Sequence, residues 1–195
     1  MSSAISPTRE KILKAAWQLL EPQSGSAARM SDIAKAAGVS RQALYLHFPN
    51  RTELFIETTK HMDAVFGVQE KLMESRTATT GEARMDAFIR AWLAYVPKMF
   101  GIAKTLITMA ETDADAAEAW DGRMADMKEG CAAAVADLVR DGQLAPQYSQ
   151  EQATDVLWAW LSITQWELLV LKCGWPQTRY VAHVQDLARR MLVAP

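Results

Sequence analysis

Cysteine is scarce in this chain of 195 residues, which contains only Cys131 and Cys173. The two are far apart in sequence, form no Cys-x-x-Cys pair and have no histidine beside them. Two thiols in a chain of this size argue against a disulfide scaffold and fit a reducing compartment, so we expect a cytoplasmic protein. We expect both cysteines to act as small, buried apolar side chains.

Long apolar runs are also absent. The residues are 50% apolar, but no uncharged stretch approaches the roughly 18–20 residues needed to cross a bilayer. The opening segment, Met-Ser-Ser-Ala-Ile-Ser-Pro-Thr, has no basic region followed by an apolar one, so we expect no secretory signal. The length is sufficient for a substantial core in one or two domains.

Motifs of the common enzyme classes are missing. There is no Gly-rich phosphate loop after a strand, no Gly-x-Ser-x-Gly and no His-Glu-x-x-His. The histidines, His47, His61 and His183, lack the spacing of metal ligands. The acidic segment 111–115 lacks the glycine and closing glutamate of a calcium loop, and Asp113 is better read as a helix cap. We therefore expect no enzyme activity, no metal and no cofactor.

Every strong apolar periodicity in the sequence is helical, and no alternating strand pattern stands out. The pattern predicts an all-α protein of about nine helices. Two short ones lie within 29–48, and Pro97 should kink or end another. The remaining helices are expected over residues 8–20, 50–75, 82–100, 102–111, 114–141, 149–172 and from 176 onward.

The stretch from Ile33 to Phe48 contains two short helical patterns that meet at a Gly-Val-Ser corner. Gly38 can adopt the positive φ that ends a helix, and the Ser40 hydroxyl can cap the next helix. In that second helix Leu44 and Phe48 lie one turn apart and face inward. A short helix with a polar outer face, held by a tight turn against a support helix, is typical of a DNA-binding helix-turn-helix.

Residues from Thr8 to about Leu54 resemble the N-terminal domain of the TetR/AcrR transcriptional regulators. The matching segments are 11–16, 32–40 and 44–54, and Arg29 stands where this family often has a capping Thr or Ser. The resemblance covers about the first third of the chain. It implies a three-helix DNA-binding domain over 1–55 and a helical ligand-binding and dimerisation domain over 56–195.

Arg41 and Gln42 are the best candidates to reach base edges, because they open the second helix of the motif. Arginine can bond twice to the O6/N7 edge of guanine, and glutamine to the N6/N7 edge of adenine. The resemblance implies that Tyr45 and His47 contact phosphates or the groove wall, and that Arg51 contacts a phosphate. Lesser phosphate contacts are expected from Ser31 and Lys35.

The charge distribution agrees with a DNA-binding N-terminal segment. Residues 1–62 carry eight lysines and arginines against five acidic residues, a net charge of +3. Since the whole chain carries −2, the remainder carries −5. Positive charge is therefore concentrated where the motif lies, as a phosphate-facing segment requires.

The second part of the chain holds most of the large aromatic and methionine side chains. A plain helical core explains any one of them, but together they favour a pocket for a flat, apolar ligand, cationic if it matches the acidic body. Gln165 lies within an apolar helix and can anchor a ligand or bond across a dimer. The other candidate lining residues are Trp92, Tyr95, Met99, Met109, Trp120, Met124, Met127, Trp158 and Trp166.

Two adjacent apolar helices at the end of the sequence present more apolar surface than a body of this size usually buries alone. In the resembled family the last two helices pair with their two-fold mates, so we expect a homodimer. The two DNA-binding domains of such a dimer can then bind half-sites roughly 34–36 Å apart in successive major grooves. The expected interface residues are Leu157, Leu161, Leu168, Tyr180, Val184, Leu187 and Met191.

These observations predict a dimeric, ligand-responsive transcriptional regulator. The simplest form is a repressor that leaves a palindromic operator when a small molecule binds. The molecule would stabilise a conformation in which the spacing of the two DNA-binding domains does not match two adjacent major grooves. An activator has the same chemistry. A helical small-molecule-binding or protein-interaction module without specific DNA binding is the alternative, although Tyr45, Arg51 and the basic excess favour DNA.

Overall fold

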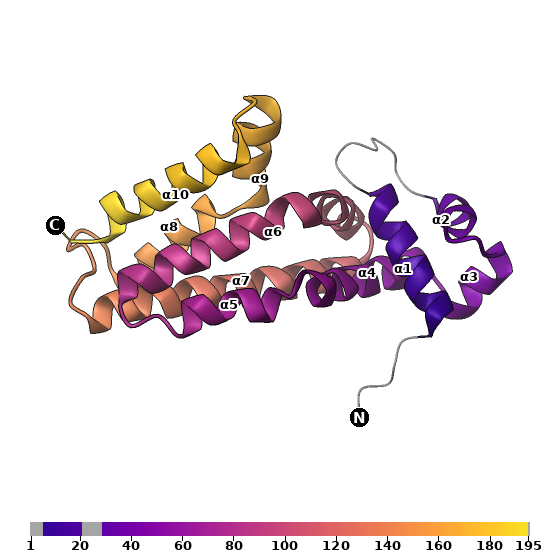
Figure 1. Ribbon diagram of the computed structural model, residues 1–195, viewed down its shortest axis with the longest axis horizontal. Helices are drawn as coiled ribbons and strands as arrows, with labels where there is room; N and C mark the ends of the chain where they lie inside the picture. The colour runs from indigo at the N-terminus through magenta and orange to yellow at the C-terminus, as the bar shows by residue number, and fades with distance from the viewer. Residues whose placement is uncertain (1–5, 21–28, 195) are drawn as a thin grey trace. The chain divides into compact units, whose positions relative to one another are not determined.

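The computed structural model describes residues 6–20 and 29–194, and these residues form an all-α protein (Figure 1). No β-strand forms within the described residues, where a single antiparallel bridge joins Leu144 and Val193. The predicted all-α fold is therefore confirmed. None of the helices in the described ranges is long and apolar enough to cross a membrane. The segment Glu21-Pro-Gln-Ser-Gly-Ser, whose composition predicts a loop after the first helix, lies outside the described residues.

Ten α-helices and one π-helical segment, η1, make up this part of the chain, close to the expected number. They are α1 (Pro7–Leu19), α2 (Met30–Ala37), α3 (Arg41–His47), α4 (Arg51–Phe66), α5 (Val68–Arg76), α6 (Gly81–Ala110), α7 (Ala114–Arg140), α8 (Gln150–Trp160), α9 (Ile163–Trp166), η1 (Glu167–Lys172) and α10 (Gln177–Leu192).

The chain forms two compact units. The first contains Met1–Phe66 and Lys98–Gly122, and the second contains Gly67–Pro97 and Arg123–Pro195. Helices α6 and α7 each contribute residues to both units. The functional division expected between residues 55 and 56 stays a prediction.

Local signals set the helices of the first unit. Ser6 caps α1 by accepting a hydrogen bond from the Arg9 N–H, and Ser40 caps α3 by accepting one from the Ala43 N–H. Gly38 ends α2 with a φ of 68°, as predicted from the corner. Helix α1 packs on α2 and α4, and α2 packs on α3. Their shared core holds the fully buried side chains of Ile12, Ile33, Leu44, Phe48 and Leu54.

The helix expected over 50–75 is in fact two helices. Its start is as predicted, because the Asn50 side chain accepts a hydrogen bond from the Glu53 N–H at 2.7 Å. Helix α4 ends at Phe66, however, and Gly67 has a φ of 63° before α5 begins. A residue in this left-handed conformation cannot continue a right-handed helix, so the expected single helix is wrong.

Helix α6 runs through Pro97 without ending, which contradicts the predicted break near residue 100. A proline inside a helix removes the N–H that would bond to the carbonyl four residues earlier, here Leu93. In this protein Gln177 Nε2 donates to the Leu93 carbonyl at 2.7 Å instead. Gln177 Oε1 in turn accepts from Trp166 Nε1 at 2.6 Å. The side chain of a distant residue thus replaces the missing backbone bond.

The helix expected over 149–172 is also divided, although its start is confirmed by a capping box between Ser149 and Gln152. Helix α8 ends at Trp160, and Ser162 caps α9 by accepting from the Gln165 N–H at 3.3 Å. A hydrogen bond from α6 stabilises this break, because Trp92 Nε1 donates to the Leu161 carbonyl at 2.8 Å. The apolar pattern of the sequence continues across this break, so the pattern did not predict that the helix is divided.

The two cysteines differ in exposure. Cys131 is buried, as expected, whereas Cys173 is exposed, so the expectation for Cys173 is wrong. Burial raises the pKa of the Cys131 thiol to about 12. Cys173 directly follows η1 where the chain turns toward α10, and it is not packed inside a helix face.

Candidate nucleic-acid interface

Helix α3 presents its polar side chains on the outside, as the sequence predicts. Leu44 and Phe48 have no exposed surface, because both pack into the core of the first unit. Arg41, Gln42 and Tyr45 are exposed. The predicted inward position of Leu44 and Phe48 and the predicted outward position of Arg41, Gln42 and Tyr45 are therefore confirmed.

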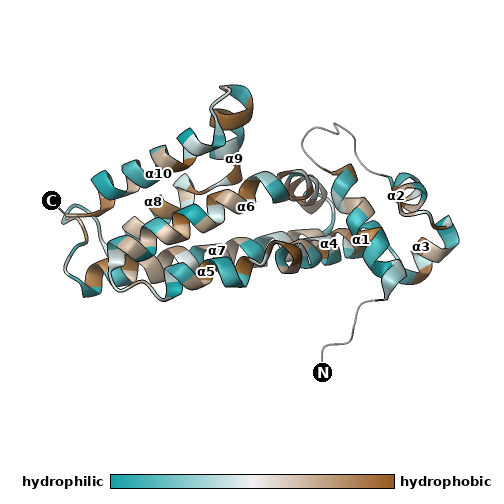
Figure 2. Cartoon of the chain, in the orientation of Figure 1, coloured by the Kyte–Doolittle hydropathy of each residue, from teal (hydrophilic) through white to brown (hydrophobic). Residues whose placement is uncertain are grey.

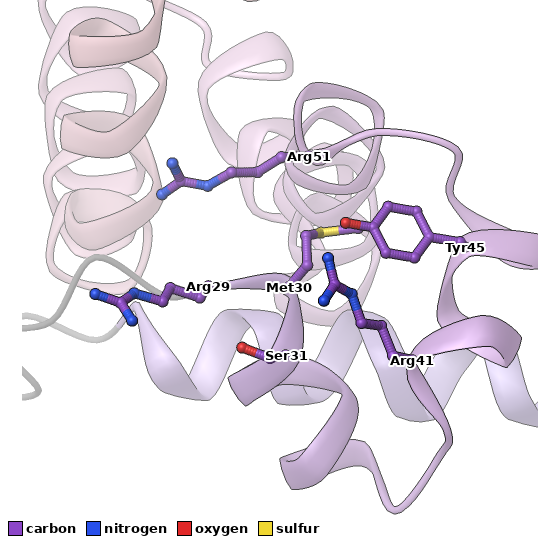
Figure 3. Close-up of a pocket in the computed structure, with 6 residues that line it drawn as sticks. All are labelled: Arg29, Met30, Ser31, Arg41, Tyr45 and Arg51. Atoms are coloured by element: carbon purple, nitrogen blue, oxygen red, sulfur yellow. The ribbon is translucent and has the colours of Figure 1, made fainter.

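An open depression of about 460 Å³ lies beside α3, and we call it the arginine depression. In Figure 3 the Arg41 guanidinium and the Tyr45 ring point toward Met30, and Arg51 reaches out from the start of α4. Four of the seven predicted DNA-contact residues meet here, together with two that were not predicted. Its lining residues are Arg29, Met30, Ser31, Arg41, Tyr45 and Arg51.

The arginine depression gathers positive charge from three separate segments. Arg29 precedes α2, Arg41 opens α3 and Arg51 opens α4. None of the three forms an ion pair with the rest of the chain as far as the structure describes it. Arg9 differs from them, because it forms an ion pair with Glu57 at 3.3 Å within the same chain.

Aromatic rings hold two of these guanidinium groups. The Arg41 guanidinium carbon lies 5.6 Å from the centre of the Tyr45 ring, and that of Arg51 lies 5.0 Å from the centre of the Phe55 ring. Because Phe55 is fully buried, the stem of Arg51 rests on the core. Such contacts orient a guanidinium while leaving its N–H donors available.

The first turn of α4 is anchored beside Arg51. Thr52 is 5% exposed, and its hydroxyl donates to Asp113 Oδ2 at 2.5 Å. Asp113 Oδ1 accepts from the Ala116 N–H at 3.1 Å, so Asp113 caps α7 as predicted. The hydrogen bond from Thr52, followed by backbone N–H donors, lowers the pKa of Asp113. Both ends of this contact belong to the first compact unit.

The other three predicted contact residues lie outside the arginine depression. Lys35 and Gln42 are exposed, and His47 is half-buried with its carbonyl accepting a 2.8 Å hydrogen bond from Arg9 Nη1. Sequence reasoning missed the contribution of Arg29. Its signal was present, because Arg29 occupies a capping position and its side chain makes no capping hydrogen bond.

Comparison with known proteins identifies the family. The family described as "Bacterial regulatory proteins, tetR family" matches residues 12–58, which include the arginine depression. The HTH-type transcriptional regulator AcrR of Shigella flexneri is 40% identical over 63 residues, covering 32% of this chain and 29% of AcrR. The HTH-type transcriptional activator FasR of Mycolicibacterium smegmatis is 34% identical over 90 residues, covering 45% of this chain and 40% of FasR. The N-terminal part of the chain, residues 12–58, therefore belongs to the TetR family.

The fold similarity to solved structures extends over nearly the whole chain. The crystal structure of a transcriptional regulator from Saccharomonospora viridis in complex with choline superposes with a TM-score of 0.83. It is 16% identical, and the match covers 98% of this chain and 100% of that one, so the likeness concerns the fold alone. The sequence matches to AcrR and FasR span less than half the length of those relatives.

The residues predicted to line a ligand pocket are divided between the two units of the chain. Met99, Met109 and Trp120 belong to the first unit, and the other seven belong to the second. Trp92 and Trp166 use their indole N–H groups in structural hydrogen bonds, as described above. No group of three or more metal-ligating side chains occurs within the described residues. The role of these candidates in ligand binding stays a prediction.

The residues predicted to form the dimer interface differ in their exposure. In α10, apolar and hydrophilic bands alternate (Figure 2), and the apolar side packs within the same chain. Leu187 is half-buried, whereas Leu168 and Met191 are 55% and 37% exposed. A partner can meet only surface that the single chain leaves open. Four candidates have no exposed surface in this conformation: Leu157, Leu161, Tyr180 and Val184.

Proposed function

We propose that this protein is a DNA-binding transcriptional regulator that binds duplex DNA through α3 and the arginine depression. The observation that carries this proposal is the convergence of three guanidinium groups that have no acidic partner in the described structure. Charges of one sign held close together repel each other and are retained where an oppositely charged ligand binds. The family match supports DNA as that ligand.

The geometry suits a phosphate of the DNA backbone. A guanidinium group can donate two parallel hydrogen bonds to the oxygens of one phosphate. The hydroxyls of Ser31 and Tyr45 add two neutral hydrogen-bond donors in the same depression. Phosphate contacts fix how the protein lies on the duplex, and base contacts provide the sequence preference. We assign Arg29, Arg51, Ser31 and Tyr45 to phosphates and Arg41 and Gln42 to base edges.

The proposal is tested by selecting duplexes from a random pool and measuring binding by fluorescence anisotropy, with a scrambled duplex as reference. We expect Arg51→Ala and Tyr45→Ala to weaken binding to selected and scrambled duplexes alike. Arg41→Ala should also relax base preference and cost ~1–3 kcal/mol on the selected duplex. The matched control is Arg190→Ala, which removes the same charge from an exposed position in the second unit.

Two results would decide against DNA binding. One is equal binding of the wild type to every duplex with no enrichment during selection. The other is that Arg51→Ala binds as tightly as Arg190→Ala. Either result favours the alternative that the chain is a helical binding module that does not read DNA.

We further propose that the regulator is a homodimer on a palindromic operator. The support is the exposed apolar surface of Leu168, Leu171 and Met191 near the end of the chain. Repression and activation use the same DNA chemistry, and FasR is an activator by name. Of the two we propose repression, with release of the operator on effector binding. Sedimentation of the wild type and of Leu168→Asp/Leu171→Asp tests the dimer.

For the effector we propose a small apolar molecule that carries a cationic group. The aromatic and methionine content of the second part of the chain and its net acidity support this class. The regulator from Saccharomonospora viridis was crystallised with choline, a quaternary ammonium compound. Aromatic cations, choline and anionic metabolites should be compared for release of labelled DNA. Release by anionic metabolites alone would contradict this assignment.

A further inference from the structure

Helix α3 has three sides, which follow from its geometry. An α-helix turns by about 100° per residue. Leu44 and Phe48 face the core, and Arg41 and Tyr45 face the arginine depression. Positions 42 and 46 each lie two residues from Leu44, and two residues turn the helix by about 200°. The third side, directly opposite the core, is therefore formed by Gln42 and Leu46.

Leu46 is the most exposed large apolar side chain of the described residues, at 82%. It takes no part in the core and does not line the arginine depression. An isolated exposed leucine on a protein surface is ordinary. This one differs because it shares the outermost side of α3 with Gln42, one helical turn away, next to the clustered arginines.

We propose that Leu46 determines specificity by contacting the 5-methyl group of a thymine in the major groove. The inference rests on the proposed DNA binding. When α3 enters the groove, the side opposite its core face meets the base edges. There thymine presents an apolar methyl group, which apolar side chains recognise, whereas glutamine bonds to an adenine edge. Gln42 and Leu46 together therefore read neighbouring positions of an A·T-containing sequence.

Charge favours DNA over an apolar protein partner at this surface. Leu46 lies on a helix flanked by the guanidinium groups of Arg29, Arg41 and Arg51, and these attract a polyanion. A protein partner recognised through a single leucine would leave those charges without partners. A thymine methyl in a duplex satisfies both features at once, since phosphates lie on each side of the groove.

The experiment replaces each thymine of the selected duplex by deoxyuridine, one at a time. This removes the methyl group and leaves the pairing and the hydrogen-bonding groups intact. For the wild type, a single replacement at the contacted position of either half-site should weaken binding about fourfold, the effect of losing the burial of one carbon group. Leu46→Ala removes this contact in both protomers of the proposed dimer, so it should bind the thymine duplex about 16-fold more weakly and be indifferent to that replacement.

Leu46→Met and Val65→Ala are the control variants. Leu46→Met keeps an apolar side chain and should keep the discrimination between thymine and deoxyuridine. Val65 is 58% exposed on α4, in the same compact unit, so Val65→Ala should bind as the wild type does. Circular dichroism checks that each variant is folded, which we expect because both positions are exposed.

The results separate the two proposals. Selective DNA binding by the wild type, with Leu46→Ala as tight and as discriminating as the wild type, would overturn the role of Leu46 alone. Equal losses for Leu46→Ala on thymine and deoxyuridine duplexes would also overturn it, because the contact would then not involve the methyl group. No selective binding by the wild type would overturn both this inference and the proposed function.

Discussion

Replacing Gln177 by leucine should destabilise the second unit far more than an ordinary surface substitution. The Gln177 side chain donates to the Leu93 carbonyl at 2.7 Å and accepts from Trp166 Nε1 at 2.6 Å. Leu93 is fully buried and Trp166 is 3% exposed, so water cannot replace either bond. Leucine removes both of these hydrogen bonds, each at a cost of about 1–3 kcal/mol, so we expect a total loss of about 2–6 kcal/mol.

The second substitution that tests this reasoning is Pro97→Ala. An alanine at this position has an N–H that can donate to the Leu93 carbonyl in the ordinary helical way. In that background Gln177→Leu removes only the hydrogen bond from Trp166 Nε1, so its cost should fall by about 1–3 kcal/mol. The interaction is therefore measured as non-additivity in a double-mutant cycle.

The assay is urea unfolding followed by far-ultraviolet circular dichroism for the wild type, the two single variants and the double variant. Gln150→Leu is the matched control, since Gln150 also opens a helix and its side chain is exposed. It should change the free energy of unfolding by less than about 0.5 kcal/mol. A cost of Gln177→Leu that is the same in the wild type and in the Pro97→Ala variant would refute the assigned role.

Three further predictions concern other contacts. Thr52→Val should cost about 1 kcal/mol of stability and weaken binding of the selected duplex, because valine cannot donate a hydrogen bond to Asp113. Thr52→Ser should restore both properties, as measured by thermal melting and fluorescence anisotropy. A valine variant that melts and binds as the wild type does would contradict the proposed anchoring of α4. A thiol reagent at mildly alkaline pH should label Cys173 and spare Cys131 until the protein unfolds, because burial raises the pKa of Cys131 to about 12; mass spectrometry showing two labels on the folded protein would be the opposite outcome. Gly130→Ala should cost about 1–3 kcal/mol in chemical unfolding, because its new methyl group would overlap the Phe88 ring at Cε2, and Phe88→Leu should recover part of that loss.

Local signals made the first unit predictable from sequence. The φ of Gly38, the hydroxyl cap of Ser40 and the inward side of Leu44 and Phe48 all depend on residues within one turn of each other. The structure then brings together Ser31, Arg41, Tyr45 and Arg51, which were chosen from the motif. Arg29 and Leu46 were not predicted as contact residues. Arg29 occupies a helix-capping position, and Leu46 is apolar, whereas DNA contacts were sought among polar residues outside caps.

Features that depend on distant partners were not predictable. The continuity of α6 through Pro97 is made possible by Gln177, which lies 84 residues from Leu93 in sequence. The break before Ser162 is held by Trp92, and the apolar periodicity on both sides of it is unchanged. An apolar stripe also does not reveal its partner, and Tyr180 and Val184 are buried within their own chain.

The most direct test of the arginine depression as a DNA-binding site is the salt dependence of affinity for the selected duplex. The wild type is compared with Arg29→Ala/Arg41→Ala/Arg51→Ala and with Arg140→Ala/Arg189→Ala/Arg190→Ala, which removes equal charge from the second unit. Each lost phosphate contact lowers the slope of log affinity against log salt by about 0.9. We expect the first triple variant to lose between two and three such steps in each protomer, about 3.6–5.4 for the proposed dimer, and the second to lose none. Equal slopes for all three proteins would contradict the proposed binding site.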